Sequence, residues 1–183
     1  MKKLIPTFLM IAAFTVATQA QIYQSKATEV TFFSTAPLEN ITAVNKVVKP
    51  LLNTKTGDVN IKVPITGFIF EKALMQEHFN ENYMESEKYP DAKFVGKIEE
   101  TIDFSKDGTH KVNIKGKLTM HGVEKERTIQ ATLVIKGGEI SIESKFKVTL
   151  KDHNITVPEL VFQKIAETVD VTLKSTMVPF QKK

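Results

Sequence analysis

Four histidines are the residues of this chain best suited to metal or acid–base chemistry: His78, His110, His121 and His153. A zinc site often draws its ligands from closely spaced pairs such as His-x-His or His-x-x-x-His, because residues at those spacings share one face of a strand or helix. None of the four histidines belongs to such a pair, and the chain has no cysteine that could supply a thiolate. The sequence therefore predicts no metal site and no thiol chemistry, and it indicates surface or structural roles for the histidines, with His121 in solvent or stabilising a turn.

Two groups of carboxylates are the next candidates, because a pair of acidic residues can act as general acid and general base. One group surrounds Glu99, and the other contains Glu124 and Glu126. Lys125 and Arg127 are interleaved with the second group, and such a mixture of charges is typical of surface ion pairs. The chain also lacks a Gly-x-Ser-x-Gly nucleophile elbow and a phosphate-binding glycine loop. We therefore expect a protein that is not an enzyme and that uses no cofactor.

Alternation of apolar and polar residues is the dominant pattern of the chain, and it is typical of strands with one buried and one solvated face. Val112, Ile114 and Leu118, for example, alternate with Asn113 and with lysines. The expected strands are residues 29–34, 41–47, 59–66, 94–102, 112–121, 128–135, 140–150 and 168–173. Turn signals separate these runs, and the clearest is Lys136–Glu139, whose central glycines permit the positive φ angles of a tight hairpin. The pattern predicts an all-β sandwich or barrel, and a closed barrel is favoured because closure removes exposed sheet edges.

One segment, Glu71–Met84, is rich in helix formers and contains neither glycine nor proline. Its apolar residues recur at three- and four-residue spacing, which predicts an amphipathic helix. We expect its apolar face to cover one end of the barrel, either as a lid or as a structural plug; that face consists of Leu74, Met75, Phe79 and Tyr83. His78 lies beside this face and could meet the head group of a ligand. A second short helix is expected at residues 158–166.

Two segments carry a resemblance to a known family. Tyr89-Pro90 ends the helical segment and leads into a strand that contains Phe94, and a later strand ends in Gly116–Val123, which reads Gly-x-Leu-Thr-x-x-Gly-Val. This arrangement resembles the YceI-like family over roughly residues 60–135. The helical segment departs from the family pattern, because Met75-Gln76 stands near the position of a common Arg-Asp pair. Contacts made by that segment are therefore not carried over from the family.

The resemblance implies an eight-stranded, lipocalin-like antiparallel barrel with one or two short helices. It also implies export to the periplasm and an interior that holds a long isoprenoid or a similar lipid-like amphiphile. The interior of an eight-stranded barrel is either packed solid or just wide enough for one slender ligand. An apolar interior would favour an alkyl or isoprenoid chain by roughly 0.8 kcal/mol for each buried methylene.

The candidate ligand-binding residues are the apolar side chains expected to face this interior. Phe68 and Phe70 belong to the set only if Gly67 marks a bulge that shifts the phase of the strand. The full set is Ile61, Val63, Phe68, Phe70, Phe79, Phe94, Ile98, Leu118, Met120, Ile129, Leu133, Phe146 and Val148. Alternation alone does not distinguish a hollow from a filled core. The alternative is therefore a packed-core structural or interaction barrel of the cell envelope that holds no ligand.

Residues 1–20 have the pattern of a signal peptide. Two lysines precede the apolar stretch Leu4–Val16, which is too short to span a bilayer comfortably, and small residues follow up to Ala20. We therefore expect cleavage after Ala20, a periplasmic location, and a YceI-like β-barrel domain comprising residues 21–183.

The charge pattern narrows the choice of partner. The net charge is +4, and loss of Lys2 and Lys3 would leave +2. Lysines and glutamates are interspersed along the rest of the chain, which indicates a solvated surface rather than a nucleic-acid interface. No second apolar run is long enough for a stable membrane span. The expected partner is an isoprenoid or lipid-like small molecule, and an exposed strand edge or the helix face could also support a homodimer.

Overall fold

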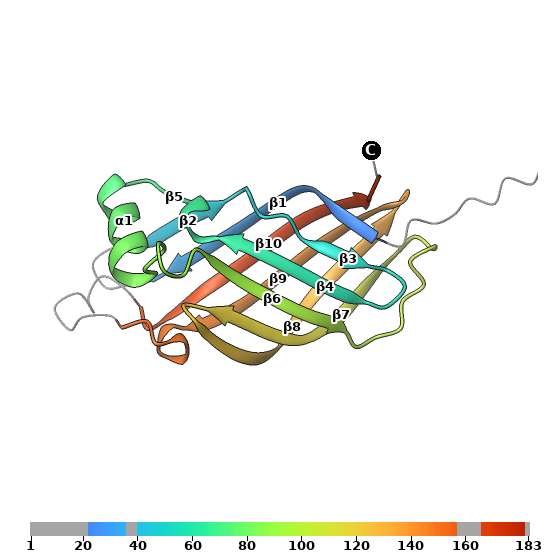
Figure 1. Cartoon of the computed structure of the whole chain (residues 1–183). Helices are drawn as coiled ribbons and strands as arrows, with labels where there is room; N and C mark the ends of the chain where they lie inside the picture. The colour runs from blue at the N-terminus through green and yellow to red at the C-terminus, as the bar shows by residue number, and fades with distance from the viewer. Residues whose placement is uncertain (1–21, 36–39, 157–165, 182–183) are drawn as a thin grey trace, which may run out of the picture.

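The computed structural model describes residues 22–35, 40–156 and 166–181, which form a sheet with one short α-helix at one end (Figure 1). The helix α1 (Ala73–His78) continues as a π-helical turn, η2 (Phe79–Tyr83), and two 3₁₀ turns are η1 (Ile65–Gly67) and η3 (Leu150–His153). The strands are β1 (Ile22–Ser34), β2 (Ile41–Asn45), β3 (Leu51–Asn53), β4 (Asp58–Pro64), β5 (Phe68–Phe70), β6 (Asp91–Ile98), β7 (Gly108–Met120), β8 (Val123–Lys136), β9 (Glu139–Thr149) and β10 (Thr168–Pro179).

Pairing of the first strand with the last closes the sheet into a barrel. β1 pairs antiparallel with β10 from Tyr23 opposite Pro179 to Phe33 opposite Asp170, and its other edge pairs with β3. The closed ring runs β1–β10–β9–β8–β7–β6–β4–β3 and returns to β1. The predicted eight-stranded antiparallel barrel with a short helix is therefore confirmed.

The two remaining strands, β2 and β5, extend the wall at the end that carries the helix (Figure 1). β1 is long enough to pair with β3 at its start and with β2 at its end, and β5 then pairs with β2. Buried Asn45 joins this extension to β4, since its Nδ2 donates to the Pro64 carbonyl at 2.8 Å while its Oδ1 accepts from the Val47 N–H at 3.0 Å. A side-chain amide thus replaces a missing step of the hydrogen-bond ladder.

Several element boundaries differ from those expected from the sequence. The first strand begins at Ile22 rather than at residue 29, β3 was not expected, and β2 and β6 end at Asn45 and Ile98. The phase of the chain shifts before Phe68 and Phe70 through the 3₁₀ turn η1 rather than through a bulge at Gly67. The expected helix at residues 158–166 lies almost entirely outside the described residues.

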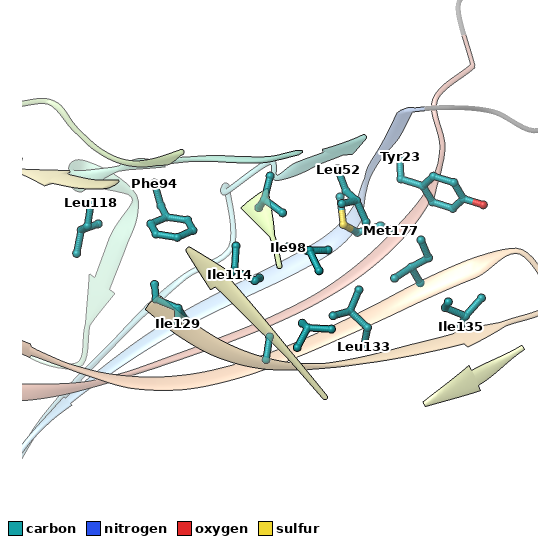
Figure 2. Close-up of a cluster of buried hydrophobic side chains, with 14 of the residues drawn as sticks. Tyr23, Leu52, Phe94, Ile98, Ile114, Leu118, Ile129, Leu133, Ile135 and Met177 are labelled. Carbon is teal, nitrogen blue, oxygen red and sulfur yellow. The ribbon is translucent and has the colours of Figure 1, made fainter. Parts of the chain in front are cut away.

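The interior is packed at the end of the barrel opposite to α1. Leu52, Leu133, Ile140 and Met177 are almost completely buried there, and Ile98 and Ile135 pack with them. Figure 2 shows this cluster as a column of side chains that runs from Leu118 and Phe94 to Tyr23 and Ile135. Side chains fill the barrel axis at the Leu133 and Ile135 end of this column, whereas Phe94 and Leu118 at its other end border open space.

A pair of glycines allows β6 and β7 to approach closely. Gly96 and Gly116 lie opposite each other in the ladder, and a Cβ added to Gly116 would lie 2.5 Å from the Cα of Gly96 and 2.4 Å from the Val95 carbonyl oxygen. Both atoms belong to the backbone and cannot rotate away. Gly116, the first residue of the family-like motif, is therefore required by sterics.

We expect Gly116→Ala to destabilise the barrel by about 1–3 kcal/mol, because the added methyl group collides with backbone atoms of β6. Urea denaturation of the purified protein would measure the change in the free energy of unfolding. The matched control is Gly108→Ala on the same strand, whose Cβ would meet only the movable ring of His110 at 3.1 Å. Equal stability of the two variants would contradict this account of Gly116.

Candidate functional site

An elongated apolar cavity of about 330 Å³ lies inside the barrel, between the packed core and the helix α1. This volume is at the lower end of the range of about 300–1,000 Å³ that is usual for small-molecule sites. The cavity follows β10 from Val169 near the helix-covered end to Met177 beside the packed core, and every second residue of that strand contributes to its wall. The alternation of apolar and polar residues along the strand thus produces a continuous apolar lining.

Most of the predicted ligand-binding residues lie on the cavity wall. Those at the wall are Ile61, Val63, Phe68, Phe70, Phe79, Phe94, Leu118, Met120, Ile129, Phe146 and Val148. Ile98 and Leu133 do not line the cavity; they belong to the packed core. Alternation identifies the face of a strand, whereas the position along the barrel axis decides whether an inward side chain meets other side chains or open space.

The prediction missed wall residues on β1, β9 and β10. Val30 and Phe32 line the cavity from β1, Ile142 lines it from β9, and Val171 and Leu173 line it from β10. The same alternation that predicted these strands already placed the five side chains on one face. Ring closure between β1 and β10 then brings the two ends of the sequence to the cavity.

The three serine hydroxyl groups in the cavity wall are hydrogen-bonded within the protein. The Ser144 hydroxyl donates to the Gln130 carbonyl at 2.7 Å, and the Ser175 hydroxyl shares a hydrogen bond with Thr28 at 2.7 Å. Ser34 accepts a hydrogen bond from the Ala166 N–H at 2.9 Å. Because these groups already have partners, the wall presents an essentially apolar surface to anything inside it.

Four phenylalanine rings close the end of the cavity beneath α1. The Phe79 ring lies 5.5 Å from that of Phe32, 5.6 Å from that of Phe68 and 5.0 Å from that of Phe70, measured between centroids. Phe79 comes from the π-helical turn, and the other three rings come from β1 and β5. The helical segment is thus held over the barrel by aromatic packing.

The lid face predicted from the helical periodicity is correct in part. Met75, Phe79 and Tyr83 are half-buried and line the cavity, and burial raises the pKa of the Tyr83 hydroxyl. Leu74 was assigned to the same face but is 61% exposed, because the helix axis turns a different stripe toward the barrel. His78 is exposed at the rim of the cavity, where it was expected to meet a head group.

The two family-like segments touch each other. Gly122 has a φ of +74°, and the Tyr89 ring occupies the space in which its Cβ would stand, at 2.7 Å. The ring of His121 packs edge-on against Tyr89 with centroids 4.6 Å apart. The side chain of His121 is only 11% exposed, so the expected turn-stabilising role is found and the solvent-facing alternative is wrong.

Buried His153 connects the turn η3 to the barrel. Its Nδ1 lies 3.1 Å from the Val123 carbonyl oxygen, and its own carbonyl lies 3.1 Å from the Nδ1 of His121. Burial lowers the pKa of the His153 imidazole. A neutral ring with a proton on Nδ1 can donate this hydrogen bond to the Val123 carbonyl. His153 therefore has a structural role.

The described residues offer no group of three or more His, Asp or Glu side chains placed to hold a metal ion. Within the same ranges, no helix has the length and apolarity needed to cross a membrane.

A family model described as a YceI-like domain matches residues 14–177. Protein YceI of Escherichia coli O157:H7 is 29% identical over 110 residues, a match that covers 56% of this chain and 54% of that protein. The UPF0312 protein plu2095 of Photorhabdus laumondii is 29% identical over 109 residues, with the same coverage. The chain thus matches about half the length of these curated relatives.

Solved structures show the same fold. A polyisoprenoid binding domain from Saccharophagus degradans, implicated in plant cell wall breakdown, superposes with a TM-score of 0.74 at 14% identity and covers 86% of this chain and 98% of that chain. BcnA of Burkholderia cenocepacia gives a TM-score of 0.68 at 16% identity, covering 81% and 95%. The YCEI protein of Campylobacter jejuni gives 0.53 at 15% identity, with both chains fully covered.

The buried imidazole of His153 leads to a prediction about pH. A lowered pKa in the folded state means that the unfolded chain binds a proton more readily, so stability is retained above the ordinary pKa near 6.5 and is lost as the pH falls below it. We expect the melting temperature to drop between about pH 7 and pH 5, and His153→Gln, which keeps a neutral donor, to reduce that drop. Thermal melts of both proteins across this interval would measure the difference. Parallel curves would exclude His153 as its source.

Proposed function

The chain belongs to the YceI-like family, and from this membership and its apolar cavity we propose that it is a binding protein that encloses one long apolar or amphiphilic molecule. An isoprenoid or a similar lipid is the best candidate, because the lining is apolar along its whole length. The polyisoprenoid binding domain with the same fold supports this choice of ligand. We further propose export to the periplasm, which is supported by the signal-peptide pattern of residues 1–20.

The observation that carries the proposal is an empty space that the chain leaves inside its own barrel. An unfilled apolar cavity of about 330 Å³ forgoes the dispersion contacts and the burial that a filled interior would provide, and this loss destabilises the folded chain. Water gains little from such a wall, because the serine hydroxyls already have partners. A hydrocarbon chain would restore the lost contacts, and each buried methylene would contribute roughly 0.8 kcal/mol.

The packed-core alternative accounts for only one end of the molecule. Side chains meet across the axis at Leu133, Ile140 and Met177, as that alternative requires. Farther toward α1 the inward side chains, including Phe94 and Leu118, face the cavity instead. The barrel therefore combines a solid base with a hollow upper part, and the proposed ligand occupies the hollow.

The direct test is to purify the protein from its native host and to analyse organic extracts by mass spectrometry. We expect a hydrophobic compound in stoichiometric amount. Protein stripped of it should bind an alkyl chain labelled with pyrene in a saturable way, and isoprenoids should displace the probe and raise the melting temperature. Repeatedly empty preparations together with no saturable probe binding would overturn the proposal.

Filling the cavity from within should weaken binding of the ligand. Ile142 lines the cavity from β9, so we expect Ile142→Trp to place its indole in the hollow and to weaken binding of the pyrene-labelled chain by tenfold or more, roughly the effect of losing two buried methylenes. The matched control is Val134→Trp, since Val134 is 38% exposed on the outer face of β8. Melting curves must show that both variants fold. Equal affinity of the two folded variants would place the ligand elsewhere.

A further inference from the structure

The barrel wall is not hydrogen-bonded along its whole height between β8 and β9. The ladder between these strands joins Ala131–Lys136 to Glu139–Ser144 and stops there. Above the last pair, residues 123–130 of β8 keep their partners on β7, and residues 145–149 of β9 keep theirs on β10, but the two strands no longer pair with each other. We call this unpaired stretch the β8–β9 split.

Three side chains bridge the split in place of the ladder. The Ser144 hydroxyl donates to the Gln130 carbonyl at its lower end, and the His153 ring contacts the Val123 carbonyl at its upper end. Between them, the guanidinium of Arg127 donates through Nη2 to the Lys147 carbonyl. The bridges from Ser144 and Arg127 end on backbone carbonyls of Gln130 and Lys147, in the stretch where β8 and β9 no longer pair.

Arg127 also packs against Phe146, whose ring lies between the split and the cavity. Its guanidinium lies 5.7 Å from the centroid of the Phe146 ring, and Phe146 lines the cavity. Arg127 has the same parity on β8 as Ile129, which faces the interior. At this height the wall therefore consists of two stacked side chains rather than of paired backbone.

A polar groove of about 400 Å³ runs along the outer face where the split begins. Its lining includes Asn113, Gln130, Glu143 and Lys145, and it also includes Ala131 and Ser144. Ala131 and Ser144 line the inner cavity as well. The last ladder pair thus borders both the outer groove and the inner cavity, directly below the split.

The other candidate routes into the cavity are held more firmly. Opening beneath α1 requires Phe79 to leave three other aromatic rings. Opening beside β2 requires fully buried Asn45 to give up the Pro64 carbonyl in a seam where Gly67 already leaves no space for a Cβ. The middle of the β8–β9 split is held by one hydrogen bond from a partly exposed arginine.

We propose that the β8–β9 split is the passage through which the apolar chain of the ligand enters and leaves the cavity, and that Arg127 holds this passage closed. The inference rests on the proposed function, because it needs a ligand to pass. While the chain moves through the split, the outer groove offers amide and charged side chains to a polar head group that remains outside. Arg127 is thus a positioning residue for exchange rather than part of the binding surface.

The first experiment measures exchange of the pyrene-labelled alkyl chain by stopped-flow fluorescence. We expect Arg127→Ala to raise both the association and the dissociation rate by about tenfold, the effect of losing one charged hydrogen bond, while the dissociation constant stays nearly unchanged. The matched control, Lys125→Ala, lies two residues away on the same strand and should leave both rates unaltered. Arg127→Lys keeps the charge without the planar fork and should lie between the wild type and Arg127→Ala.

The second experiment locks the split. If the register of Ala131 opposite Ser144 is continued toward α1, Thr128 stands opposite Lys147. The double variant Thr128→Cys with Lys147→Cys can therefore be cross-linked through its two thiols across the split. The chain has no native cysteine that would compete for the cross-linker. We expect this cross-link to slow exchange strongly. The same cross-link between Thr132→Cys and Glu143→Cys, a pair already inside the ladder, should have no effect.

The outcomes separate the two proposals. If the wild type shows no saturable binding of the probe, the proposed function itself fails. If binding is saturable but exchange is unchanged in Arg127→Ala or in the Thr128–Lys147 cross-linked protein, the passage lies elsewhere and the inference is overturned. A rise in the dissociation rate alone, with weaker binding, would also overturn it, because Arg127 would then act on the bound state.

Discussion

The structure depends on closing one sheet around an interior that its side chains fill only in part. Closure requires the first strand to pair with the last, and the long ladder between β1 and β10 provides this pairing. The packed base formed by Leu133, Ile140 and Met177 supplies the hydrophobic stabilisation that a hollow barrel would lack. The cavity can then exist above it, since the fold is held by the base, by the ladders and by the aromatic packing beneath α1.

The sequence predicted the wall well because a strand has only two faces. Period-two alternation placed Phe94, Leu118 and Phe146 on the inner face, and the structure finds all three at the cavity. The same rule placed Ile98 and Leu133 there, although they lie in the packed base. Height along the axis depends on strand tilt and register, which no local pattern encodes. The prediction that Leu74 faces the barrel was wrong for a related reason. Helical periodicity identifies an apolar stripe, but packing decides which side of that stripe is covered.

The glycines and the tyrosine of the family-like segments serve the architecture, whereas Phe94 and Leu118 of the same segments line the cavity. Gly116 permits the close approach of β6 and β7, and Gly122 leaves space for the Tyr89 ring beside its turn. Tyr89 in turn packs against His121, so the segment that follows the lid is fixed to the β7–β8 hairpin. A motif of this kind identifies the fold but not the ligand, because most side chains of the cavity wall are interchangeable apolar residues outside the motif.

The wall of this barrel is closed partly by backbone ladders and partly by single side chains, and the two kinds of closure differ in how they open. A complete ladder opens only by separating many cooperative hydrogen bonds, whereas side-chain bridges such as those from Asn45, Ser144 and Arg127 break singly. Within the described residues, such bridges lie at two places where neighbouring strands do not pair, between β2 and β4 and between β8 and β9. At the first place the bridge is buried, and at the second the central bridge is partly exposed. Because exposure lets water replace a broken hydrogen bond, the wall is weakest to opening at the split between β8 and β9.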